Sequence, residues 1–264
     1  ALPEGTTLLL MGGLTPSGTS SADILRINPS TGKSTRIATL SQPVHDAGGA
    51  RLGSRYVVFG GGAETVLGAV QAYTPGQASS TIIGRLPRLR ADLTVAGNGT
   101  GTAYVVGGFD GAKPDSSVLA TTDGTAFKTI ATLPVPVRYG AAAAMGNYLW
   151  VIGGDRGTAP TTAIQRISLA TGAATVTANL PAALDHAVAV VIKGTMLVLG
   201  GIINGHPSSI IWRLDPTTGT VVKAGTLPQA VSMPAAAVVS GAAYLLGGES
   251  ATTLGTVIRI QPTN

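Results

Sequence analysis

Short runs of apolar residues, each ending in a pair of glycines, recur along the chain. Tyr104–Val106 precedes one pair and Leu149–Ile152 precedes the next. Runs of this length bounded by turn residues are typical of buried β-strands. The pairs occupy residues 12–13, 60–61, 107–108, 153–154, 200–201 and 247–248, so their first glycines are 48, 47, 46, 47 and 47 residues apart. A constant period of this length predicts a propeller or another array of repeats.

Three further segments recur within each period. A loop follows the glycines and leads into an alternating strand such as Ile211–Leu214, which we expect to have one solvated face. The next strand ends in Leu-Pro, as at Leu133-Pro134, and a strand of small residues such as Ala141–Ala144 follows. Small side chains suit the innermost strand, where strands crowd around an axis. The sequence therefore predicts an all-β, six-bladed β-propeller of four-stranded antiparallel blades, forming a single domain over residues 1–264.

The length of the chain predicts an incomplete or irregular closing blade. Six full repeats would need about 18 residues more than are present. We expect the first blade to begin at its second strand, Thr6–Met11, without an inner strand, and the sixth to end at its third, Thr256–Ile260. Irregular closure, truncation or disorder of flanking residues, and strands from another chain are the alternatives, and we favour the second. We expect a monomer unless another chain completes the exposed edges.

The chain resembles the Kelch-repeat family. The likeness rests on the segment Tyr104–Gly111 and on the turn Asp215-Pro216, and it extends over nearly all 264 residues. The tryptophan usual in the fourth strand is absent, and an aromatic residue stands in register before the glycines only at Tyr104, Trp150 and Tyr244. The resemblance implies that the loop after each glycine pair and the loop joining successive blades emerge on one face, around the mouth of the central channel.

Charge is scarce in this chain and is concentrated in those loops. Charged residues make up 11% of the sequence, and eight of its 12 acidic residues fall in the loops assigned to the mouth or just beyond them. We predict a ligand-binding rim formed by His45, Asp46, Glu64, Arg90, Asp92, Asp110, Arg138, Tyr139, Asp155, Arg156, Asp185, His186 and Glu249. Arginine and tyrosine are enriched at recognition hot spots, so we expect Arg90, Asp92, Arg138 and Tyr139 to form the contact patch. The alternative is that these loop charges are merely solvated or tie adjacent blades together.

The favoured function is a non-catalytic scaffold that recognises a protein or carbohydrate ligand at the mouth. The alternative is a sugar-modifying enzyme similar to the six-bladed Kelch-type sialic-acid epimerases, in which Glu64 or Glu249 with Arg138 or Arg156 would move a proton. A single degenerate Asp-box-like turn, Thr122–Phe127, is the one hint of a sialidase. Kelch-like copper radical oxidases require a cysteine crosslinked to tyrosine, and the chain has no cysteine.

The sequence predicts neither a cofactor nor a metal. The pairs His45-Asp46 and Asp185-His186 fall on opposite blades, too far apart to share one zinc ion. The net charge of +5 comes from dispersed basic residues without interleaved aromatics, which disfavours nucleic acid. The longest stretch without charge, Ala224–Gly248, contains Pro228 and Pro234 and predicts strands rather than a membrane span. Low charge, many threonines and the suspected loss of a signal segment predict an extracellular or cell-envelope location.

Overall fold

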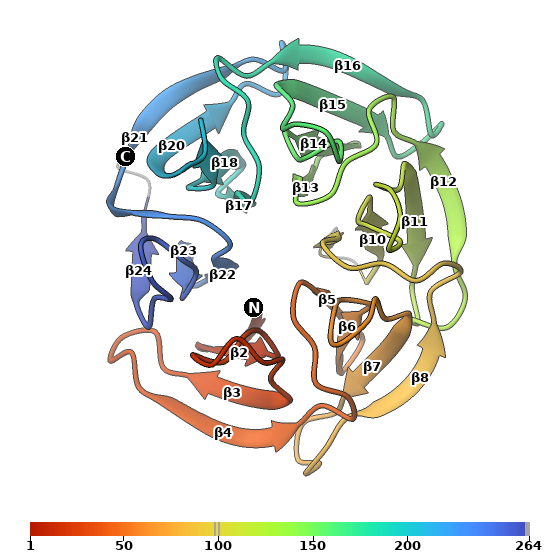
Figure 1. The fold of residues 1–264 in the computed structure, drawn as a ribbon, viewed down its shortest axis with the longest axis vertical. Coiled ribbons are helices and arrows are strands. Elements are labelled where there is room, and N and C mark those ends of the chain that lie inside the picture. The colour runs from red at the N-terminus through yellow and green to blue at the C-terminus, as the bar shows by residue number, and fades with distance from the viewer. Residues whose placement is uncertain (98, 100, 262–264) are drawn as a thin grey trace.

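The chain folds into a ring of six β-sheets arranged as blades around a central channel (Figure 1). The structure is a computed structural model that describes residues 1–97, 99 and 101–261. The predicted all-β, six-bladed propeller is confirmed. No helix in these described ranges has the length and apolarity needed to cross a membrane.

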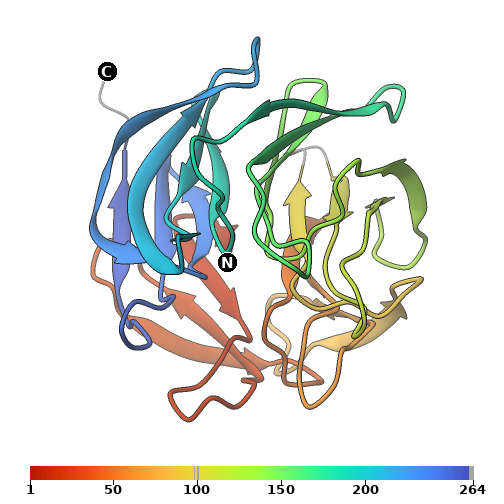
Figure 2. The ribbon, with the colours of Figure 1, turned by 45° about the horizontal axis from the view of Figure 1, so that its top comes forward.

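The main antiparallel strands of each blade follow the order of the chain from the channel outward (Figure 1). The exception is the two-residue strand Ile202–Ile203, which pairs with residues 206–207 of the strand after it. Figure 2 shows the same ring tilted by 45°. The first three blades comprise β1 (Leu2–Glu4), β2 (Thr7–Met11), β3 (Asp23–Ile27), β4 (Ser34–Thr39); β5 (Gly48–Leu52), β6 (Arg55–Phe59), β7 (Ala69–Tyr73), β8 (Thr81–Arg85); and β9 (Thr94–Gly97), β10 (Ala103–Val106), β11 (Ser117–Thr121), β12 (Lys128–Thr132). The last three comprise β13 (Ala141–Met145), β14 (Tyr148–Ile152), β15 (Ala163–Ser168), β16 (Ala174–Asn179); β17 (Val188–Ile192), β18 (Thr195–Leu199), β19 (Ile202–Ile203), β20 (His206–Leu214), β21 (Val221–Val231); and β22 (Ala235–Val239), β23 (Ala242–Leu246), β24 (Val257–Ile260).

Apolar side chains fill the interfaces between adjacent blades. Six clusters of buried residues occur, one at each interface, and the one between blades four and five is built around Trp150 and Trp212. Small residues line the channel side as predicted, most clearly in β13, where Ala141–Ala143 are buried. The hydrophobic core of the described residues therefore lies between adjacent blades, in six separate clusters.

The predicted solvated face of the third strands is present in β3, where Arg26 is exposed, but absent from β7. All five residues of β7 are buried, and Gln71 and Gln165 are 1% and 0% exposed. The amide of Gln71 accepts a hydrogen bond from Gln42 N–H (2.8 Å) and donates one to Gln42 C=O (3.1 Å). Gln165 bonds both backbone groups of Val135 in the same way, at 2.9 and 3.0 Å. Gln71 and Gln165 are therefore buried because their side-chain amides bind the backbone of a loop that covers them.

The ring closes without the gap expected at its first blade. The prediction that blade one lacks an inner strand was wrong, because Leu2–Glu4 pairs with β2 as a short inner strand, with Leu2 opposite Leu9. Blade six has three strands in the described part of the chain, as predicted. Leu8 and Ile27 of blade one pack against Tyr244 and Leu246 of blade six, so apolar contacts close the ring.

Each glycine pair allows a loop to cross close above it. Gly153 and Gly154 both have positive φ angles, 62° and 102°, and the N–H of Gly154 donates to Leu184 C=O at 2.8 Å. A Cβ atom on Gly153 would collide with that carbonyl oxygen. Glycine is required because the backbone both adopts a left-handed conformation and lies against another backbone. This contact fixes the loop that leads to the channel mouth.

Candidate functional site

The loops joining successive blades place equivalent residues in a ring at the channel mouth. Asp46, Asp92, Tyr139, His186 and Met233 all have left-handed φ angles between 49° and 57°. The N–H of each later residue donates to the C=O of the one before it, at 2.9 to 3.0 Å. Left-handed backbone at non-glycine residues costs on the order of 1 kcal/mol each, and this hydrogen-bonded arc holds them there. The residues that the spacing after Leu-Pro made equivalent in sequence therefore also have the same backbone conformation and equivalent positions in the structure.

The residue directly before each of these left-handed residues connects the loop between two blades to a loop that follows a glycine pair. Arg138 forms a β-bridge with Asp155, and Asp185 forms one with Ile202. Both partners directly follow a glycine pair. The two loop types therefore lie on one face, as the family resemblance implied.

Arg138 is the centre of a charged network at the mouth. Its Nε lies 2.9 Å from Asp92 Oδ2, and its Nη2 donates to the Tyr139 hydroxyl at 3.0 Å. The hydroxyl in turn donates to Asp46 Oδ2 at 3.4 Å. The guanidinium also lies 4.6 Å from the ring centre of Phe109 and 4.5 Å from that of Tyr139, within cation–π range. Side chains from four loops thus converge on one arginine.

Tyr139 contacts one member of each of the two acidic–histidine pairs. Its ring stacks on His186 with centres 3.8 Å apart, while its hydroxyl reaches Asp46. His186 Nδ1 lies 3.0 Å from Asp185 Oδ1, and His45 Nε2 lies 4.0 Å from Asp46 Oδ2. Within residues 1–97, 99 and 101–261, no cluster of three or more potential metal ligands is found.

Burial sets the ionisation of this network. Burial raises the pKa of Asp92, and the nearby Arg138 charge opposes the rise. Burial, followed by the charges of Asp46 and Asp92, raises the pKa of Tyr139, so its hydroxyl remains a donor. Burial pulls the pKa of Arg138 down, but the bond to Tyr139 and the charge of Asp92 outweigh it and raise the pKa. The site therefore combines a fixed cation with a carboxyl group whose pKa is raised.

Arg90 does not belong to the contact patch. Its side chain is 1% exposed, and its Nη2 lies 3.2 Å from Asp115 Oδ2 of the next blade. Its other donors reach Gly107 C=O and Ser117 Oγ, both at 3.0 Å. Arg90 therefore ties blades two and three together, which is the structural role considered as the alternative.

The remaining predicted rim residues lie outside the Arg138 network. Glu64 and Arg156 are exposed in the loops after their glycine pairs, and Glu249 is half-buried. The carboxylates of Asp110 and Asp155 accept backbone N–H bonds within their own loops. The structure brings together five of the predicted residues around the tyrosine hydroxyl and ring: Asp46, Asp92, Arg138, Tyr139 and His186.

Comparisons with known proteins identify the repeat. The family model described as the Kelch motif matches residues 184–228, the stretch from the mouth loop before β17 to Leu227-Pro228. The solved structure of YjhT is similar to this chain, with a TM-score of 0.85 and 16% sequence identity. The match covers 100% of this chain and 94% of the YjhT chain. One segment of this six-bladed β-propeller therefore matches a Kelch motif. At this identity the likeness to YjhT is one of fold, and no curated protein matches the chain.

Sequence reasoning missed two residues of the propeller's mouth. Phe109 provides a face for the Arg138 guanidinium, and Met233 completes the left-handed arc. Both were identifiable as equivalents by spacing, since Phe109 directly follows a glycine pair and Met233 stands five positions after the proline of Leu227-Pro228. They were passed over because the search was restricted to polar side chains.

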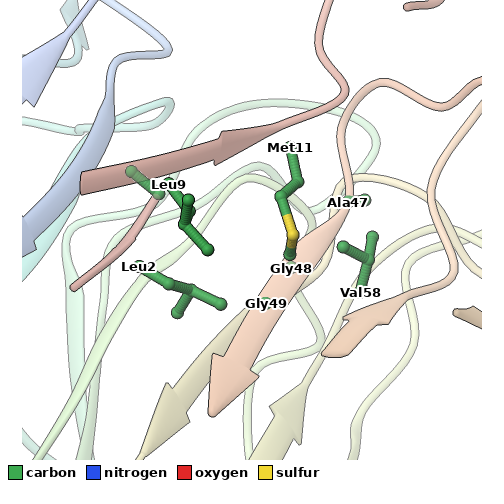
Figure 3. A pocket seen from close by; sticks show the side chains of 8 residues that line it. Leu2, Leu9, Met11, Ala47, Gly48, Gly49 and Val58 are labelled. Carbon is green, nitrogen blue, oxygen red and sulfur yellow. The ribbon is translucent and has the colours of Figure 1, made fainter. Parts of the chain in front are cut away.

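Two cavities lie away from the network. One of about 40 Å³ between blades one and two is lined by Leu2, Leu9, Met11 and Val58 around Gly49 (Figure 3), and it is far smaller than an ordinary ligand pocket. Another of about 330 Å³ lies beside Phe127 and Lys128 on the face opposite the mouth. The Asp-box-like turn is on that same opposite face, where Asp123 accepts bonds from its own turn. Neither cavity is lined by a residue of the Arg138 network.

Proposed function

We propose that this propeller is a non-catalytic binding module that recognises a carbohydrate or protein ligand at its mouth. The observation that carries the proposal is the Arg138 network. Five side chains from four loops are held by one another, and the arginine remains 27% exposed. An aromatic surface beside a few fixed polar groups is the usual composition of a recognition site, and arginine and tyrosine are the residues that most often dominate binding energy.

The charge of the mouth narrows the class of ligand. The mouth loops contain eight of the 12 acidic residues but only five of the 17 basic ones, although the whole chain has a net charge of +5. The five are Arg88, Arg90, Lys113, Arg138 and Arg156. Complementarity therefore favours a neutral or cationic ligand, such as a neutral or amino sugar, over a polyanion.

A thermal-shift and calorimetric screen of neutral, amino and acidic sugars tests the binding proposal. We expect one of the first two classes to stabilise the wild-type protein and to lose at least tenfold in affinity with Arg138→Ala. The control is Arg213→Ala, an exposed arginine on β20 remote from the mouth, which should bind normally. If no sugar binds, or if both variants bind equally well, carbohydrate recognition at Arg138 is ruled out and a protein ligand remains.

Asp92 supports the second candidate, a sugar-modifying enzyme. A buried carboxyl group with a raised pKa beside an arginine can transfer a proton. One-dimensional NMR of sugar anomers or epimers should then show exchange catalysed by the wild-type protein and lost in Asp92→Asn. Asp123→Asn on the opposite face is the control. Binding without exchange would favour the scaffold.

A further inference from the structure

The two faces of the propeller carry charge of opposite sign. The face opposite the mouth is formed by the turns that join the first main strand of a blade to its second and the third to its fourth. Eleven of the 17 basic residues lie in these turns or in the half of a strand farther from the mouth, together with three of the 12 acidic residues. This surface, the basic face, therefore has an excess of positive charge, whereas acidic residues outnumber basic ones at the mouth.

The three acidic residues of the basic face are engaged in contacts of their own. Glu4 accepts two hydrogen bonds from the Arg26 guanidinium, at 2.5 and 3.0 Å. Asp123 accepts bonds from backbone N–H groups of its own turn at 2.8 and 3.0 Å, and Asp215 does the same at 2.8 and 3.4 Å. These carboxylates therefore leave the other basic side chains of the face uncompensated.

Seven exposed basic side chains of the basic face have no ion-pair partner in the part of the chain that the structure describes. They lie on blades one, two, three, five and six, and blade four contributes the half-buried Arg166 (Figure 1). The charge is thus distributed around the whole ring and is not gathered in one sector. The seven residues are Lys33, Arg51, Lys128, Lys193, Arg213, Lys223 and Arg259.

Arginines of the third strands extend toward the basic face. The Arg26 guanidinium binds Glu4, the last residue of β1, at the end of that strand far from the mouth. The Arg166 guanidinium lies 4.7 Å from the ring centre of Tyr148, the first residue of β14, and 5.7 Å from that of Trp150. Four third strands have an arginine in this register, opposite the residue three positions before the glycine pair. They are Arg26, Arg166, Arg213 and Arg259.

Tyr148 adds an amphipathic side chain to the basic face. It is 37% exposed, and the Arg166 guanidinium lies over its ring. Val222, in the half of β21 farther from the mouth, is 50% exposed. Tyrosine is enriched at membrane–water interfaces because its ring is apolar and its hydroxyl is polar. Attraction to anionic headgroups and burial of apolar groups together determine binding at a bilayer surface, and this face offers both.

We propose that the basic face docks the propeller on an anionic lipid bilayer, with the mouth turned away from the lipid. Anionic headgroups attract each lysine or arginine that lies within a Debye length of the bilayer surface. A bilayer presents headgroups to all six blades at once, whereas a linear polyanion contacts only the blades along its path. Single-stranded nucleic acid binds through stacked aromatic platforms, and Tyr148 is the one exposed aromatic residue among those that the structure describes.

Co-sedimentation with vesicles tests the proposal. We expect the protein to bind vesicles of equal parts phosphatidylcholine and phosphatidylglycerol in low salt, and not to bind vesicles of phosphatidylcholine alone. Raising the salt concentration should weaken binding to the mixed vesicles at least tenfold, because salt screens exposed charges.

A triple variant locates the binding surface. Lys33→Glu, Lys128→Glu and Arg213→Glu change exposed residues on blades one, three and five that have no ion pair within the described ranges. Combined in one protein, they should weaken binding to the mixed vesicles at least tenfold, while circular dichroism shows an unchanged fold.

The matched control places the same change of net charge on the other half of the molecule. Arg85→Glu, Arg88→Glu and Lys113→Glu alter exposed residues in the half of the propeller nearer the mouth. This variant should bind the mixed vesicles with an affinity within threefold of the wild type.

Three results would overturn the proposal. One is the absence of binding to the mixed vesicles in low salt. Another is an equal loss of affinity in the two triple variants, because net charge and not the basic face would then govern binding. The third is tighter binding to a DNA duplex than to the mixed vesicles at the same phosphate concentration, since a linear polyanion would then be the partner. Sugar binding at Arg138 is measured separately, so the two proposals can fail independently.

Discussion

Gly153→Ala and Gly247→Ala form a matched pair that tests why a glycine ends each second strand. Both glycines have a φ of 62°, so alanine brings the same left-handed backbone strain, about 1–2 kcal/mol, to each. Only at Gly153 does the new methyl group collide with a carbonyl, that of Leu184. The two substitutions therefore differ in one respect, the presence of a loop above the glycine.

The expected difference follows from what the collision displaces. Moving the Leu184 carbonyl breaks its 2.8 Å hydrogen bond from Gly154 N–H, and leaving that group unpaired costs about 1–3 kcal/mol. Overpacking adds roughly 1–3 kcal/mol. Gly153→Ala should thus lower the free energy of unfolding by about 3–8 kcal/mol, against about 1–2 kcal/mol for Gly247→Ala.

Urea unfolding followed by tryptophan fluorescence measures both values, because Trp150 is fully buried in blade four. The thermal midpoints should differ by roughly 10 °C in the same order. Equal losses of stability in the two variants would refute the reasoning, since left-handed strain alone would then explain the glycine.

Three further predictions concern stability. Asp115→Asn should lower the free energy of unfolding by about 3 kcal/mol, because the buried Arg90 charge loses its counter-ion; an effect below about 0.5 kcal/mol in urea titration would contradict this. Gln165→Ala should cost about 2–4 kcal/mol by the same assay, since both backbone groups of Val135 lose their partners, and a neutral substitution would show that water replaces the amide. The pKa of Asp92 is higher in the folded protein than its ordinary value of 3.8, so its contribution to the free energy of unfolding is complete below pH 3.8 and is lost as the pH rises through the folded pKa. Asp92→Asn should therefore remove this decline from the free energies measured by urea titration at a series of pH values. Parallel pH dependences of the wild type and the variant would count against this prediction.

The repeat could be predicted because local physical requirements recur at a fixed spacing. Each glycine pair marks a place where a backbone adopts positive φ under a crossing loop, and Gly153 with Leu184 shows the requirement directly. The same regularity placed Arg138-Tyr139 and Asp185-His186 at equivalent positions before their contacts were known. The sequence therefore predicts which residues of successive blades occupy equivalent positions, because each blade repeats the same backbone geometry.

The burial of individual polar side chains could not be predicted from the sequence in the same way. Arg90 and Arg138 both follow a Leu-Pro within the same kind of loop, yet one is buried against Asp115 and the other is partly exposed above Phe109. Gln71 stands in an alternating strand that predicts a solvated face, but a neighbouring loop covers it. Whether a polar residue ties blades together or remains available to a ligand depends on the adjacent blade.

The sequence by itself determined the architecture of this protein: six blades, glycines under crossing loops, small residues toward the channel, and the face on which the charges gather. These features depend on backbone conformation and on residue size, which act within one repeat. Only the tertiary structure decided which charges form the Arg138 network and that Leu2–Glu4 forms the inner strand of blade one. Those outcomes depend on contacts between residues as far apart as Asp46 and Tyr139, and closure of the ring is what brings such residues together.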